Sequence, residues 1–168
     1  MGVKVSVKSK GDSFDDMIQR LKTIDGKGVE VGVLKGEHKW LAGIHEYGCN
    51  IQITPKMRAY LRGRGLYLKK STTHIHIPER AFLRTGYDQN CGEVAKKAAK
   101  MGADVVAGKM TARGCCQAVG MELASKIKDH ARGMPPGNHS FTVANKGSST
   151  PLVDSGDMIG GISWRMAK

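Results

Sequence analysis

Two histidines on one predicted strand are the first residues whose types and spacing could do chemistry. His74 and His76 alternate with Ile75 and Ile77, so in an extended strand both imidazoles lie on the same face. Such a pair could form half of a metal site, with a third ligand coming from elsewhere in the chain. The same spacing is typical of the polar face of a half-exposed strand, and this is the interpretation we favour.

Two other groupings contain reactive residue types. Gly11, Asp12 and Ser13 resemble the nucleophile block of one class of lipases, but they open a predicted helix, where Asp and Ser are favoured capping residues. A catalytic triad also needs a base, and no later Asp-x-x-His block supplies one. His45 and Glu46 are adjacent in a predicted helix, so their side chains point about 100° apart instead of converging.

The sequence lacks the usual metal and nucleotide motifs. Four cysteines are present without any CxxC spacing, which favours reduced thiols over a zinc site: Cys49, Cys91, Cys115 and Cys116. The glycines form neither GxGxxG nor GxxxxGK[ST] after a strand. We therefore expect a protein that is not an enzyme, with no catalytic residue, no metal ligand and no cofactor.

The chain carries a large net positive charge, which bears on the partners it could bind. The 168 residues include 27 Lys and Arg against 15 Asp and Glu, a formal charge of +12. This balance permits nucleic acid or acidic protein partners. The densest positive charge lies in residues 55–71, where basic and aromatic side chains interleave: Lys56, Arg58, Tyr60, Arg62, Arg64, Tyr67, Lys69 and Lys70.

Three interpretations of this basic segment are open. Lys and Arg interleaved with aromatic residues can follow a phosphate backbone. The segment could equally be a solvated loop, or a loop that becomes ordered against a neighbouring subunit. We rank the last two together slightly above direct contact with nucleic acid.

The sequence gives no sign of a membrane protein. No apolar run approaches the ~20 residues needed to cross a bilayer. The first residues lack the continuous apolar core of a signal peptide. They fit the short myristoylation pattern, with Gly2 and Ser6 in place, but they also alternate like a strand, which we favour. We expect a soluble protein made in a cytosol.

Hydrophobic periodicity predicts one α+β domain over residues 1–168, in which a small, mostly antiparallel sheet packs against two long helices. Strands are predicted at 3–8, 29–33, 50–54, 72–77 and 162–166, with 72–77 paired to 50–54. Helices are predicted at 12–24, 38–48, 79–108, 111–131 and just after 154. Residues 55–71 and 133–150 are predicted to be long loops.

The helices carry recognisable apolar stripes. In the first, Phe14, Met17, Ile18 and Leu21 share one face. The two long helices show the same spacing, in Val94, Ala98, Met101 and Val105 and then in Ala112, Cys116, Val119, Leu123, Ile127 and Ala131.

Two stretches are predicted to be abrupt structural joints. In the first, Pro78 ends a strand, Glu79 favours the start of a helix, and Phe82 and Leu83 anchor that helix on the sheet. In the second, a proline and a leucine fix the entry to a short helix that is capped by the residues following them: Pro151, Leu152, Asp154 and Ser155.

An ordered series of blocks resembles the tail-completion or neck proteins of tailed bacteriophages. The blocks are IHEYG at 44–48, HIPERAFLR at 76–84 followed by Asp88, PPGN at 135–138, and KGSSTPLVDSGDM at 146–158, before a terminal strand. The family pattern runs as HEFG, then I-P-x-R-x-F-[LI]-R, then K-G-S-x-P-L-[IV]-D-[ST]-G. The basic insert between the first two blocks is absent from many compact members, so the resemblance implies no role for it.

The resemblance implies a structural virion protein that performs no chemistry. It would form a homo-oligomeric ring, for which we expect about six copies, at the phage neck or the head-proximal end of the tail. Its partners would be the head-connector or adaptor protein and the tail-tube or tail-terminator protein. It would be assembled in the host cytoplasm. The alternative is a nucleic-acid-binding module that uses the basic segment, and a ring with that segment facing DNA in its lumen is compatible with both.

Overall fold

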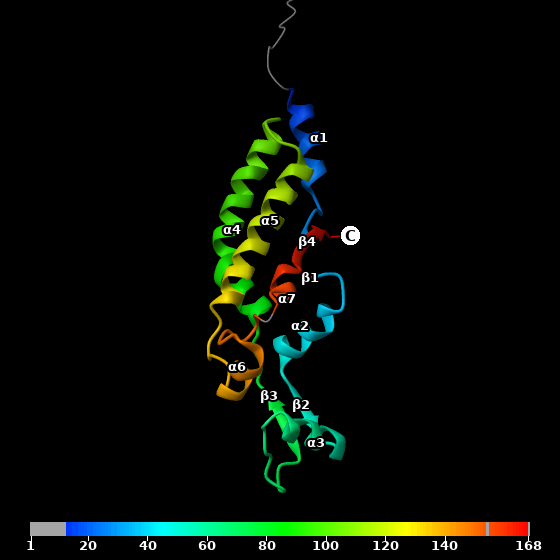
Figure 1. The fold of residues 1–168 in the computed structure, drawn as a ribbon. Coiled ribbons are helices and arrows are strands. Elements are labelled where there is room, and N and C mark those ends of the chain that lie inside the picture. The colour runs from blue at the N-terminus through cyan, green and yellow to red at the C-terminus, as the bar shows by residue number, and fades with distance from the viewer. Residues whose placement is uncertain (1–12, 154, 168) are drawn as a thin grey trace, which may run out of the picture.

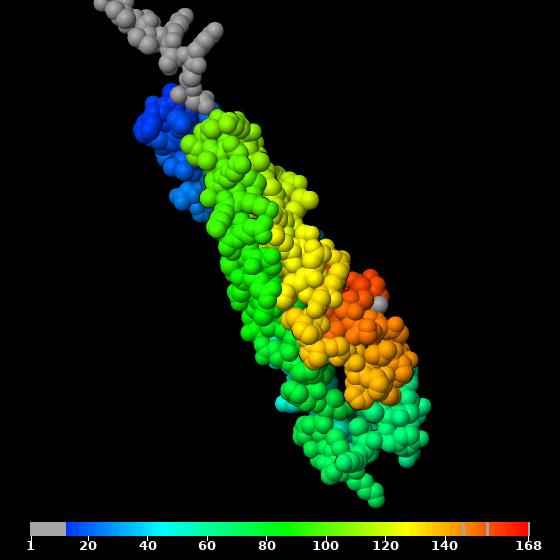
Figure 2. All heavy atoms as spheres, turned by 90° about the vertical axis from the view of Figure 1, so that its left-hand side faces the viewer, coloured from blue at the N-terminus to red at the C-terminus, as the bar shows by residue number. Residues whose placement is uncertain are grey.

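The computed structural model describes residues 13–153 and 155–167 and confirms the α+β class. The predicted strand at 3–8 and the predicted caps Asp12 and Asp154 lie outside the described residues. The molecule is elongated, with a helical hairpin at one end and a small β-hairpin lobe at the other (Figures 1 and 2).

Two long helices form the body of the molecule, as the apolar stripes predict. Helix α4 spans Phe82–Val106 and α5 spans Ala112–Arg132. They lie side by side as an antiparallel pair (Figure 1). The side chain of Thr111 accepts a hydrogen bond from the Gly114 amide and so caps α5 as expected.

The first sheet packs on α5. Strand β1 (Val29–Val33) pairs antiparallel with β4 (Ile162–Met166), with Val31 opposite Trp164. The Trp164 ring lies against Gly120 of α5, where even a methyl group would come within 2.6 Å of the ring. Residues from both strands and both helices meet in one core, including Val33, Phe82, Leu123, Ile127, Ile159 and Ile162.

The second sheet is separate from the first. Strand β2 (Cys49–Gln52) pairs antiparallel with β3 (His74–Ile77), which confirms the predicted pairing of these segments. Within residues 13–153 and 155–167 the two ladders share no strand, so the single small sheet expected from the sequence is here two two-stranded sheets. The β1–β4 ladder is the one that packs on α5.

The two predicted long loops each contain a helix, so the prediction of loop structure was wrong for these residues. Helix α3 spans Pro55–Gly63 within the 55–71 segment, and α6 spans Ser140–Lys146 within 133–150. In α3, Thr54 caps the helix by accepting a hydrogen bond from the Met57 amide, and Pro55 occupies the first turn. The density of charge in residues 55–71 concealed α3, and the glycines, prolines and weak apolar periodicity of residues 133–150 concealed α6.

Two further short helices complete the fold near the second joint. Helix α2 spans His38–Tyr47 and α7 spans Asp157–Gly160. The capping position of α7 is Gly156, with φ +89°, and not the predicted Ser155. The Ser155 hydroxyl still accepts a hydrogen bond from the Asp157 amide at 3.3 Å.

Helix α1 (Phe14–Ile24) begins where the sequence predicts. The Ser13 hydroxyl accepts from the Asp16 amide while the Asp16 carboxylate accepts from the Ser13 amide, a reciprocal capping box. Ser13 is therefore a helix cap, as we favoured over the nucleophile. The apolar stripe of α1 is not buried, since Phe14 is 76% and Leu21 56% exposed.

Replacing Gly120 with Val is expected to destabilise the protein, because the added atoms collide with the Trp164 ring that holds the β1–β4 sheet on α5. The expected loss is about 1–3 kcal/mol in the free energy of unfolding, measured by urea denaturation. Gly92→Ala is the control. Gly92 lies within α4 with no atom near its added methyl group, so this change should stabilise the protein by about 0.5–1 kcal/mol. Equal effects of the two substitutions would contradict the packing described.

Candidate functional site

The segment from Cys49 to Ile77 forms a lobe that projects from the long helices. It consists of β2, α3, β3 and their connections, and it lies at the end of the molecule opposite α1 (Figures 1 and 2). It contains no Asp or Glu and six basic residues: Lys56, Arg58, Arg62, Arg64, Lys69 and Lys70. We call residues 49–77 the basic lobe.

One of the predicted contact residues has a structural role instead. Arg58 donates hydrogen bonds to the carbonyl oxygens of Leu68, Lys69 and Thr72, at 3.2, 2.9 and 2.6 Å. These bonds fasten the returning chain to α3, because a guanidinium presents several donors in a fixed geometry. The arginine therefore holds the lobe in shape and has few donors left for a partner.

The other predicted contact residues are exposed on the lobe. Tyr60 is 59% and Tyr67 77% exposed. The Arg64 guanidinium lies over the Tyr60 ring, 5.3 Å from its centroid. A shallow groove of about 380 Å³ runs over the lobe, and Arg62, Tyr67 and Lys70 help to line it. The structure thus leaves these basic and aromatic side chains exposed on the lobe and places Arg62, Tyr67 and Lys70 along one groove.

The two histidines of β3 lie on the exposed face of the lobe, as the alternation predicts. His76 is hydrogen-bonded to the Asn50 side chain at 2.8 Å, and His74 to the Thr73 hydroxyl at 3.0 Å. Over residues 13–153 and 155–167, no cluster of three His, Cys, Asp or Glu side chains is placed to hold a metal. The histidines belong to the polar surface of the strand.

A buried carboxylate joins the base of the lobe to α4, and sequence analysis missed it. Glu46, at the end of α2, is 3% exposed. Its two oxygens accept hydrogen bonds from the backbone amides of Leu83 and Arg84, at 2.9 and 3.0 Å. These amides belong to the first turn of α4, where negative charge is favoured. Helix α4 has no side-chain cap of its own, so Glu46 serves as that cap from elsewhere in the chain.

The Arg84 side chain completes this joint. Its Nε donates to Glu46 at 2.9 Å, and its terminal nitrogen donates both to the Glu46 carbonyl oxygen and to Glu79. The guanidinium also lies 4.8 Å from the centroid of the Tyr47 ring. The hydrogen bond to Glu46 is the main reason that the pKa of Arg84 is raised. We call Glu46, Glu79 and Arg84 the lobe clamp.

The predicted joint residues around the clamp lie in the core or at the end of a strand. Phe82 is fully buried, Leu83 is packed against the core, and Pro78 follows the last residue of β3. Gly48 has φ +67°, and a methyl group there would lie 2.8 Å from the Glu79 amide nitrogen. Only glycine fits this crossing of the two chain segments.

The second joint closes against the C-terminal core. Leu152 is 3% exposed, Pro151 is buried beside it, and Met158 is 5% exposed. The Asn138 side chain donates to the carbonyl oxygens of Ser148 and Thr150, both at 3.0 Å. Asn138 therefore links the PPGN block to the KGSST block.

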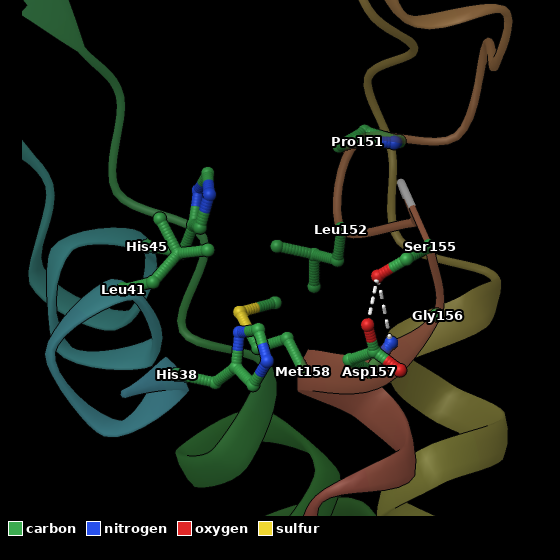
Figure 3. Close-up of a pocket in the computed structure, with 9 residues that line it drawn as sticks. All are labelled: His38, Leu41, His45, Pro151, Leu152, Ser155, Gly156, Asp157 and Met158. Carbon is green, nitrogen blue, oxygen red and sulfur yellow. Dashed lines mark hydrogen bonds between the residues drawn. The ribbon is translucent and has the colours of Figure 1, made fainter. Parts of the chain in front are cut away.

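A cavity of about 240 Å³ between α2 and this second joint contains residue types found in hydrolases: His38, His45, Ser155 and Asp157. The Ser155 hydroxyl is hydrogen-bonded to Asp157. In Figure 3 both imidazoles lie on the α2 side, and the Ser155–Asp157 pair lies on the other side, with Leu152 drawn between them. This arrangement does not place a histidine as a base for the serine.

No protein-family model matches the chain, and comparison with curated proteins and with solved structures gives no significant match. Within the part of the chain that the structure describes, no helix is both long and apolar enough to cross a membrane.

Replacing Glu46 with Ala is expected to lower the free energy of unfolding by about 3 kcal/mol, because two partly buried amides of α4 and one arginine lose their acceptor. Urea denaturation measures the loss. Glu79→Gln is the matched control. Its carboxylate is exposed, and its replacement should cost less than about 1 kcal/mol. A smaller loss for Glu46→Ala than for Glu79→Gln would contradict the role of the clamp.

Proposed function

We propose that this chain is a structural protein of a tailed-phage neck, or of the head-proximal end of the tail. It forms a ring that joins head and tail and contacts an adaptor protein on the head side and a tail-tube or terminator protein on the tail side. Its function is assembly: residues of the ring cover surfaces of neighbouring copies and of these partners. It acts within the virion and is assembled in the host cytoplasm.

The observation that supports this proposal most is the pairing of the blocks that carry the resemblance. Glu46 in the first block binds the Leu83 and Arg84 amides in the second. Asn138 in the third block binds carbonyl oxygens in the fourth. What the blocks encode is therefore a set of joints, which is what a family of structural proteins would share.

Exposed apolar side chains also favour an assembly role. Besides the stripe of α1, Trp40 is 74% and Tyr47 69% exposed. Large apolar side chains that share one exposed helix face, as Phe14, Met17 and Leu21 of α1 do, are typical of sites where another protein binds. The thin supply of aromatic residues, 5% of the chain, makes their placement on the surface notable.

Reversing charge on the basic lobe is expected to block the joining of heads and tails. Arg62→Glu with Lys70→Glu alters exposed side chains that line the lobe groove and leaves the Arg58 bonds intact. Counting joined particles by electron microscopy should show a loss of at least about tenfold. Lys96→Glu with Lys100→Glu makes the same change of net charge on the exposed face of α4 and should join normally. Normal joining by both variants would count against the lobe as a contact surface.

A second candidate function is nucleic-acid binding by the same lobe, favoured by its six basic residues without any acidic residue. If the lobe neutralises phosphates, the logarithm of the affinity for DNA falls with the logarithm of salt concentration by about 0.9 per phosphate. The Arg62→Glu, Lys70→Glu variant should then reduce this slope by about 2, measured by fluorescence anisotropy. An unchanged slope would exclude the lobe as the DNA contact.

A further inference from the structure

The outer edge of β1 is open and lies beside an apolar groove. Every backbone hydrogen bond recorded for Val29–Val33 in the described structure belongs to the ladder with β4, so the other edge has no partner there. The groove next to it has a volume of about 470 Å³. Its apolar lining comes from β1, α4 and α5: Val29, Val31, Leu83, Tyr87, Leu123 and Ile127.

An open strand edge with apolar surface beside it is suited to receive another strand. Unpaired amide and carbonyl groups on the edge supply the hydrogen bonds, and the groove receives alternate side chains. The strand VEVGV contains neither proline nor lysine, and its one charged residue is Glu30.

The chain itself contains a segment with the complementary pattern. Residues 3–8 read VKVSVK, so in a strand Val3, Val5 and Val7 share one face and the two lysines and the serine share the other. Six residues match the five residues of β1 in length. With the valines in the groove, the lysines would lie on the same face as Glu30 of β1.

Charge favours the β1 edge over the other open edge of this sheet. Beside β4 a smaller groove of about 280 Å³ is lined partly by Lys128. A lysine-bearing segment would meet a like charge there. The lining of the β1 groove includes both Asp88 and Arg84, whose charges offset each other, so a basic strand meets no net like charge on that side.

The reach of the chain favours a segment from a neighbouring copy. Arg20 of α1 donates to the Val106 carbonyl oxygen at the end of α4, so α1 begins near the tip of the helical hairpin, away from β1 (Figure 1). The 11 residues of α1 separate Ser13 from the chain leading to β1 by about 16 Å. Five Cα spacings separate residue 8 from Ser13, at most about 18 Å. To lie along β1, the segment of the same chain would have to cover the length of α1 and residues 25–28 as well with this reach, whereas a segment from a neighbour has no such limit.

We propose that residues 3–8 of one copy add as a third strand to the β1 edge of a neighbouring copy, with Val3, Val5 and Val7 in the groove. The inference rests on the proposed ring, because it requires a neighbour. It assigns the segment a role as the link between successive subunits.

Chemical cross-linking of full-length chains tests this proposal. One chain carries Ser6→Cys and the other, distinguished by a mass tag, carries Glu30→Cys on the outer face of β1. In both, the partly exposed Cys49 and Cys91 are changed to Ser. After mixing, a short bismaleimide should give the mixed dimer. Ser163→Cys, on the outer face of the neighbouring strand β4, replaces Glu30→Cys as the control and should give about tenfold less product.

Adding Val5→Asp to the Ser6→Cys chain should also reduce the mixed product about tenfold, because a charge would enter the apolar groove. Cross-linking only within a single chain carrying both cysteines, or preferentially to Ser163→Cys, would overturn the proposal. The proposal would also be overturned if the protein sediments as an oligomer but gives no mixed dimer. That result would not contradict the proposed ring. If the mixed dimer forms but the protein is absent from the head–tail junction, strand addition between copies is supported and the proposed function in the phage neck is contradicted.

Discussion

The buried carboxylate of Glu46 is the interaction on which the arrangement of the two ends of this molecule depends. It caps the first turn of α4 from the end of α2 and binds the Arg84 guanidinium. The 36 residues between Glu46 and Leu83 include the whole basic lobe, so the clamp closes the base of the lobe on the long helices. A carboxylate taken out of water is stabilised only when its oxygens are well paired, and here helix amides and an arginine meet that need.

This arrangement explains how a small chain with little aromatic content can present a projecting surface in a fixed direction. The core lies between α4, α5 and the β1–β4 sheet, while the second sheet has no such layer behind it. The lobe is held instead by polar contacts: the clamp at its base, and the Arg58 bonds to three carbonyl oxygens farther out. The remaining basic and aromatic side chains stay exposed, as the proposed assembly surface requires.

Much of the fold follows from local signals in the sequence. The apolar spacing in the two long helices, the Thr111 cap, the positions of strands β1 and β4 and the pairing of β2 with β3 were all predicted. Helix α3 was not, because Thr54 followed by Pro55 was taken only as the end of a strand. Helix α6 was not, because residues 133–150 show little apolar periodicity. The role of Glu46 could not be found from its neighbours, since its partners are 37 and 38 residues away. The signal available was the missing cap at the start of α4.

We propose that these side chains form surfaces for assembly at the head–tail junction. Cryo-electron microscopy of particles carrying this chain gives the direct test. We expect a closed ring of density at that junction, into which this fold can be placed with α4 and α5 as its longest features. Complete, infectious particles in which the chain is absent, or is located away from the junction, would contradict it.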